Sequence, residues 1–190
     1  MIGLVVILAL SAALIVYLVG IYNGLVNLRE SVKVAWANID VLLKQRHDEL
    51  PKLIEACKRY MQFEQETLEK VMRARASVSA ASTSGNVAAV GAAEQQLRAG
   101  VSRLFAVAEN YPQLKTDETF KQLQQRITAL EESIADRREL YNDQVNLNNI
   151  RVSVFPDVMI AQRFGFKPAQ LLEFSAAEKA DVDVGALFST

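Results

Sequence analysis

The feature that most constrains this chain is its N-terminal segment, which carries no charged side chain before Arg29. From Ile2 to Tyr22 it is apolar apart from two glycines and one serine. About 20 such residues at roughly 1.5 Å each cross a hydrocarbon core of about 30 Å, so the segment predicts a transmembrane helix. No Lys or Arg precedes it, and the stretch 19–23 lacks the small-x-small pattern of a signal-peptide cleavage site. The sequence therefore predicts a retained anchor over residues 1–28.

The basic residues around this segment predict its orientation. Only the N-terminal amine precedes it, whereas Arg29, Lys33 and Lys44 follow it closely. Because basic residues flanking a membrane helix favour the cytoplasmic side, we expect a single-pass protein with its N-terminus outside and its C-terminal domain in the cytoplasm.

Small residues form a stripe along the anchor. When the segment is drawn as a helix, Ala9, Ala13, Gly20 and Gly24 lie on one side, and the last two form a GxxxG pair. Small side chains let two membrane helices approach closely, so this stripe predicts a homo-oligomer. Small residues are also common in membrane helices, and the alternative is that the stripe has no partner.

Beyond the anchor, apolar residues recur at alternating spacings of three and four, as in an α-helix and close to the heptad of a coiled coil. The pattern keeps its phase from Leu25 past Pro51 to Met72, which favours one long helix kinked at Pro51 over two separate helices. Its apolar side includes Leu25, Leu28, Val32, Trp36, Ile39, Leu43, Leu50, Leu53, Cys57 and Tyr60.

Two further helices are predicted downstream. Residues 82–86 read as a turn, a helix follows from Val87 to about Asn110, and another runs from Thr116 to Phe155-Pro156. Three long helices with short connections must pack antiparallel to bury their apolar sides, so residues 29–155 predict an all-α antiparallel bundle. Residues 156–190 predict short helices, the second over 169–174, and an acidic tail that is mobile or needs a partner.

The composition excludes several functional classes. A net charge of −1 argues against nucleic-acid binding, which needs a basic surplus. With a single Cys and a single His, the chain cannot form an internal disulfide or the common zinc and di-iron sites. We therefore expect no metal and no cofactor.

Several short motifs occur in a specific order and spacing. They are Tyr22-Asn23-Gly24, Val32-Lys33-Val34-Ala35-Trp36, Arg46-His47-Asp48-Glu49-Leu50-Pro51, Tyr141-Asn142-Asp143 and Phe155-Pro156-Asp157. Following the N-terminal apolar helix, this series resembles the LemA family of bacterial membrane proteins over nearly the whole chain. The family pattern repeats Tyr-Asn seven residues after the first, whereas this chain has Asn148-Asn149 there. The resemblance implies a single-pass inner-membrane protein with a cytoplasmic helical domain and no established enzymatic activity.

No group of residues forms a convincing catalytic site. His47 has no orienting acid and nucleophile on its own helix face, so a surface role is expected. Cys57 lies on the apolar side and predicts a core thiol. The Glu131-Glu132 pair is interspersed with arginines, as on a solvated helix face, although paired carboxylates could also bind a divalent cation.

The remaining candidates are structural. Trp36, Pro51, Tyr141 and Asn142 are expected to shape the bundle, and Phe155 and Pro156 to plug and turn its end. The alternative is that Tyr141-Asn142 and Phe155-Pro156 form a recognition surface.

These observations predict a non-enzymatic scaffold that is anchored in the lipid bilayer and assembles with its own copies or with an unidentified protein. A single-pass sensor subunit is the alternative, and a metal-dependent hydrolase comes last.

Overall fold

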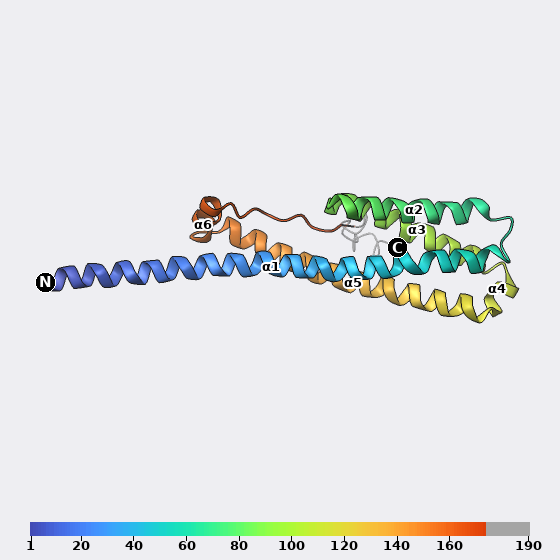
Figure 1. Ribbon diagram of the computed structural model, residues 1–190, viewed down its shortest axis with the longest axis horizontal. Helices are drawn as coiled ribbons and strands as arrows, with labels where there is room; N and C mark the ends of the chain where they lie inside the picture. Colours follow the sequence, from blue (N-terminus) through green and yellow to red (C-terminus); the bar gives the residue numbers. More distant parts are fainter. Residues whose placement is uncertain (174–190) are drawn as a thin grey trace, which may run out of the picture. The chain divides into compact units, whose positions relative to one another are not determined.

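The computed structural model describes residues 1–173 (Figure 1). These residues form helices and no strand, so the predicted all-α class is confirmed. The helices are α1 (Ile2–Lys58), α2 (Gln65–Ser84), α3 (Val87–Ala108), α4 (Pro112–Thr116), α5 (Glu118–Ser153) and α6 (Asp157–Phe164). The described residues divide into an N-terminal unit, Met1–Ile39 with Ala135–Leu171, and a bundle unit, Asp40–Ile134 with Leu172 and Glu173.

Helix α1 is continuous through Pro51 but ends at Lys58, so the expected single helix to Met72 is wrong. The backbone N–H groups of Tyr60 and Met61 both donate to the Cys57 carbonyl, and a turn follows before α2. Met61 is fully buried although it lies in this turn. The apolar period therefore continues across a change in chain direction, which is why the pattern alone suggested one helix.

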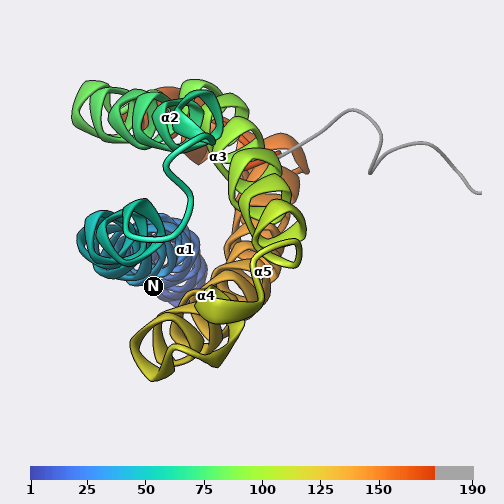
Figure 2. The same cartoon turned by 90° about the vertical axis from the view of Figure 1, so that its right-hand side faces the viewer.

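The bundle unit is built from the second half of α1 with α2, α3, α4 and the first half of α5. The turn at 85–86 separates α2 from α3: Gly85 adopts a left-handed φ of 67°, and the Asn86 side chain accepts the Ala89 N–H. Figure 2 shows α2, α3 and α5 in an arc beside α1. Their predicted apolar sides face inward, and Leu50, Leu53 and Cys57 of α1 are fully buried.

Short polar connections set the start of α5. Pro112 opens α4, where its missing N–H is not needed. Asp117 then accepts the Phe120 N–H at 2.9 Å, so Asp117 caps α5, which begins two residues after the predicted start at Thr116.

The N-terminal unit pairs the first half of α1 with the antiparallel second half of α5, and α6 packs across their end (Figure 1). Gly165 ends α6 with a φ of 74°, as its position predicts. The expected second short helix is wrong for the residues that the structure describes, since 166–173 have no helical backbone. Phe174 and the acidic tail lie outside the described residues.

Candidate functional site

Residues 2–20 of α1 form an exposed apolar segment, and packing against other helices begins after it. Every residue from Met1 to Gly20 is exposed, whereas Ile21 is buried. Within α1, the most apolar window of 18 residues has a mean hydropathy of 2.9, and none of it is buried. In the described chain this is the one helix long and apolar enough to cross a membrane.

Three helices meet directly after this segment. They bury one apolar cluster of Ile21, Leu25, Val152, Ala161 and Phe166. The Tyr22 ring lies beside Phe164 and Phe166, with ring centroids 5.0 and 5.7 Å apart and edge-on geometry. Helix α6 is therefore packed at the level where the apolar segment ends.

Residues 166–171 form an extended strap that α5 holds by its polar side chains. Asn149 makes a pair of hydrogen bonds with Ala169: its Nδ2 donates to the carbonyl at 3.0 Å, and its Oδ1 accepts the N–H at 2.8 Å. Asn148, only 3% exposed, donates to the Lys167 carbonyl at 3.3 Å. The two asparagines thus supply the polar partners that an extended backbone segment needs.

Tyr141 completes this grip on the strap. Its hydroxyl donates to the Gln170 carbonyl at 2.9 Å, and burial raises its pKa. Its ring packs against Trp36 of α1, with centroids 5.5 Å apart. Tyr141 therefore links α5 both to α1 and to the strap, and the structural roles expected of Tyr141 and Trp36 stay predictions.

An ion pair between a half-exposed arginine and a buried aspartate joins α5 to α6. The Arg151 guanidinium contacts the carboxylate of Asp157, which is 6% exposed. A Cβ added to Gly24 would stand 3.3 Å from Arg151 Nη2. Gly24 is therefore packed within its own chain, while Ala9, Ala13 and Gly20 stay exposed on α1.

The bundle unit contains a second cluster of charged side chains, which is almost completely excluded from solvent. The Arg46 and Glu94 side chains form an ion pair and are each 2% exposed. Arg46 Nε, Glu94 Oε1 and Glu131 Oε1 are buried without a hydrogen-bond partner. Burial raises the pKa of both Glu94 and Glu131, and the nearby Arg46 and Arg98 oppose this at Glu131. Unsatisfied charged atoms in such a place are energetically costly.

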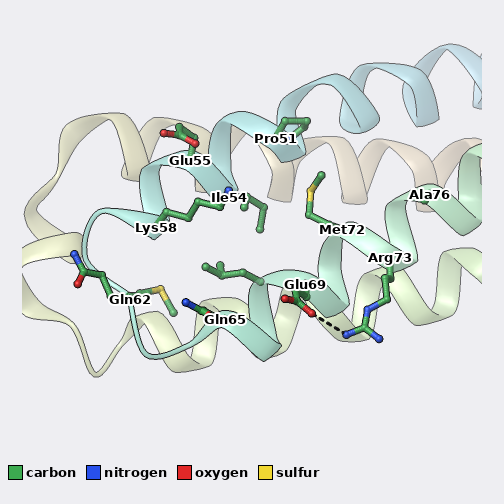
Figure 3. Close-up of a pocket in the computed structure, with 12 residues that line it drawn as sticks. Pro51, Ile54, Glu55, Lys58, Gln62, Gln65, Glu69, Met72, Arg73 and Ala76 are labelled. Atoms are coloured by element: carbon green, nitrogen blue, oxygen red, sulfur yellow. Dashed lines mark hydrogen bonds and ion pairs between the residues drawn. The ribbon is translucent and has the colours of Figure 1, made fainter.

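A groove of about 860 Å³ lies between the end of α1 and α2 (Figure 3). Its buried apolar floor is formed by Ile54, Met61 and Leu68. Charged side chains line its sides, and Glu69 and Arg73 pair with each other at 3.1 Å. An apolar floor with charged sides is the kind of surface that takes an amphipathic helix.

The surroundings of Cys57 and His47 do not favour catalysis. Cys57 is fully buried, and burial raises its pKa to about 12, so the predicted core thiol is confirmed. His47 is half-buried, and burial followed by the charge of Arg75 lowers its pKa. Within residues 1–173, no group of three or more His, Cys, Asp or Glu side chains could hold a metal ion.

The expected plug at the bundle end is wrong. Phe155 is 78% exposed, because the chain turns there and directs the ring outward, while Pro156 precedes the first turn of α6. Asn142 is half-buried on α5. The packing role predicted for Ala9, Ala13, Gly20 and Gly24 stays a prediction.

Sequence reasoning missed Arg46, Glu94 and the strap. A signal existed for the first two, since Arg46 stands between Leu43 and Leu50 at helical spacing, on the apolar side. Glu94 likewise interrupts an apolar side. Asn148 also gave a signal, since it stands between Val145 and Val152 at helical spacing, on the apolar side. No such pattern marks Asn149 or the strap.

Comparison with known proteins gives one family. Residues 35–185 match the model of the LemA family. Two proteins of Paramagnetospirillum magneticum, magnetosome proteins MamQ 1 and MamQ 2, are each 25% identical over 192 residues, which cover 88% of this chain and 70% of theirs. Protein LemA of Metamycoplasma hominis is 25% identical over 173 residues, covering 89% of this chain and 76% of that protein.

Proposed function

Since this chain belongs to the LemA family, we propose that it is a non-enzymatic helical scaffold anchored in the bacterial inner membrane. The observation that carries the proposal is the exposed apolar segment of α1, which continues without a break into the helices of the domain. An exposed apolar surface of this length needs lipid or protein around it.

Two features support an assembly role. Ala9, Ala13 and Gly20 are small and exposed, which suits close packing between anchors of neighbouring copies. The groove between α1 and α2 suits a helix from a protein partner.

The proposal is tested by the mass of the full-length protein in mild detergent and by crosslinking in native membranes. We compare the wild type with Ala9→Leu/Ala13→Leu, which fills the small-residue stripe without lowering its hydropathy. Ala12→Leu is the matched control, because it lies about 90° around the helix from the stripe.

A regular assembly in the wild type and in Ala12→Leu, lost in Ala9→Leu/Ala13→Leu, is the expected result. Monomers of the wild type in both detergent and membranes would overturn self-association. Wild-type protein that is released from membranes by alkaline carbonate would overturn the anchor itself.

The proposed orientation places the N-terminus outside and the domain in the cytoplasm, as the basic residues after the anchor favour. Alkaline phosphatase fused to the C-terminus is then expected to be inactive, and green fluorescent protein fused there to fluoresce. The reverse pattern would contradict this orientation.

A further inference from the structure

We propose that α6 and the turn before it bind the surface of the lipid bilayer that α1 crosses, so that the N-terminal unit rests on the membrane. The partner is the headgroup layer of a bilayer containing anionic lipid. This inference rests on the anchor proposed above.

The level of α6 along α1 carries the first step. Ile2 to Tyr22 at about 1.5 Å per residue already match a hydrocarbon core of roughly 30 Å, so Tyr22 lies near the membrane surface. The Phe164 ring of α6 is 5.0 Å from the Tyr22 ring, and Ala161 is buried against Ile21 and Leu25. Figure 1 shows α6 beside the N-terminal half of α1. With Tyr22 near the membrane surface, α6 is therefore held at the depth of the headgroups.

The side chains that α6 leaves uncovered carry the second step. Its buried positions are Asp157 and Ala161, whereas Met159 is 62% exposed and Phe164 is 58% exposed. Phe155, in the turn before α6, is 78% exposed. Large apolar side chains beside an apolar membrane segment gain free energy when they enter the interfacial layer.

The charges near these side chains carry the third step. Arg163 stacks over Phe164 with its guanidinium carbon 6.0 Å from the ring centroid, and Lys167 is exposed. The one acidic residue of α6, Asp157, is buried and paired with Arg151. The solvent-facing charges of residues 154–167 are thus basic, and basic residues beside apolar ones favour anionic headgroups.

The test measures the depth of single fluorophores on the full-length protein in vesicles of phosphatidylcholine and phosphatidylglycerol in equal amounts. A maleimide dye is attached to Met159→Cys, to Leu10→Cys within the anchor, or to Val34→Cys, which is 61% exposed on α1 beyond the membrane. The native Cys57 is fully buried with a pKa of about 12, so it does not react, and the unsubstituted protein serves as the labelling blank.

Nitroxide groups placed near the headgroup or at the chain end of the lipids then quench each dye. We expect the dye at Met159→Cys to lose fluorescence to the headgroup nitroxide, the dye at Leu10→Cys to the chain-end nitroxide, and the dye at Val34→Cys to neither. Replacing phosphatidylglycerol by phosphatidylcholine is expected to reduce quenching at Met159→Cys and to leave Leu10→Cys unchanged.

Two other outcomes overturn the proposal and are distinguishable. Quenching at Leu10→Cys without quenching at Met159→Cys would leave the anchor intact and show that α6 does not touch lipid. Shielding of the dye at Met159→Cys that depends on the protein-to-lipid ratio and not on the nitroxide would assign this surface to a second copy. No quenching at Leu10→Cys would instead contradict the anchor, and this inference with it.

Discussion

Arg46 and Glu94 lie at positions that a helical bundle usually fills with apolar side chains. Each side chain is 2% exposed, and each leaves one polar atom without a hydrogen bond. The ion pair therefore adds little net stability, but the two charges depend on each other because neither can reach water. The free energy of unfolding is therefore expected to fall when one partner of the pair is removed.

Glu94→Ala is expected to destabilise the protein by about 3–5 kcal/mol, because it removes the ion-pair partner of the buried Arg46 charge. The double replacement Arg46→Met/Glu94→Met removes both charges and is expected to recover most of this loss. Urea unfolding in detergent, followed by circular dichroism, measures both changes.

Arg73→Ala is the matched control for this experiment. Arg73 also pairs with a glutamate, Glu69, but both side chains are exposed, so a change of only about 0–1 kcal/mol is expected. An equal effect of Glu94→Ala and Arg73→Ala would show that burial does not govern these pairs.

The stability of the protein is expected to depend on pH through Glu131. Burial raises its pKa above the ordinary value of 4.5, so the folded protein holds this proton more tightly than the unfolded chain. Its contribution to stability is therefore lost as pH rises from 4.5 through the folded pKa. Glu131→Gln cannot ionise, and its stability relative to the wild type is expected to increase with pH across this window.

Unfolding free energies at a series of pH values test this expectation. Glu132→Gln, at the exposed neighbouring position of α5, is expected to keep the wild-type profile. A constant difference between Glu131→Gln and the wild type at every pH would contradict the assigned cause.

At the scale of elements, the helices that carry periodic apolar patterns could be predicted from the sequence. The ranges of α3 and α5 are close to those expected. The break after Lys58 could not be predicted from the sequence, because Met61 keeps the apolar period while the backbone turns.

The strap is the element that sequence patterns could not reveal. An extended segment held by side-chain amides has no period, and its partners Asn148 and Asn149 stand where the family pattern has Tyr-Asn. The charged cluster was visible only as an interruption of two apolar sides.

Asn149→Ala is expected to release the strap. It removes both hydrogen bonds to Ala169, and two neutral bonds are together worth about 1–2 kcal/mol, so exchange of the Ala169 amide hydrogen should accelerate by roughly tenfold. Asn146→Ala changes an exposed asparagine of the same helix and is expected to leave this rate unchanged. Equal rates in the two variants would show that these bonds do not hold the strap.

Two glycines of α3 make a second matched pair. A Cβ at Gly91 would overlap the backbone carbonyl of Glu173, whereas a Cβ at Gly100 would meet Val71 Cγ2 at an ordinary 3.5 Å. Gly91→Ala is therefore expected to displace the chain at Glu173 and to speed proteolysis there. Gly100→Ala is expected to leave proteolysis unchanged and to stabilise α3 by up to about 1 kcal/mol. Slower proteolysis in Gly91→Ala would contradict the close approach.

At the scale of the whole molecule, the exposed segment and the folded domain should be separable. Residues 2–19 are exposed, and burial begins only at Ile21, so removing them uncovers no buried side chain of the domain. Deleting 2–19 is expected to yield protein that remains in solution with a nearly unchanged melting temperature. Deleting 2–25 also removes Ile21 and Leu25 from the apolar cluster and is expected to lower it. A large loss of stability in the shorter deletion would contradict this division.

The continuity of α1 means that residue number also sets an angle. Each residue of an α-helix adds about 100° of rotation and 1.5 Å of rise. One residue inserted after Val16 would therefore swing the side bearing Ala9 and Ala13 about 100° around the axis relative to α6. Seven inserted residues would return it to within about 20° of its original direction, roughly 10 Å farther away. The number of residues between the small-residue stripe and Ile21 thus fixes the direction in which the stripe faces relative to α6.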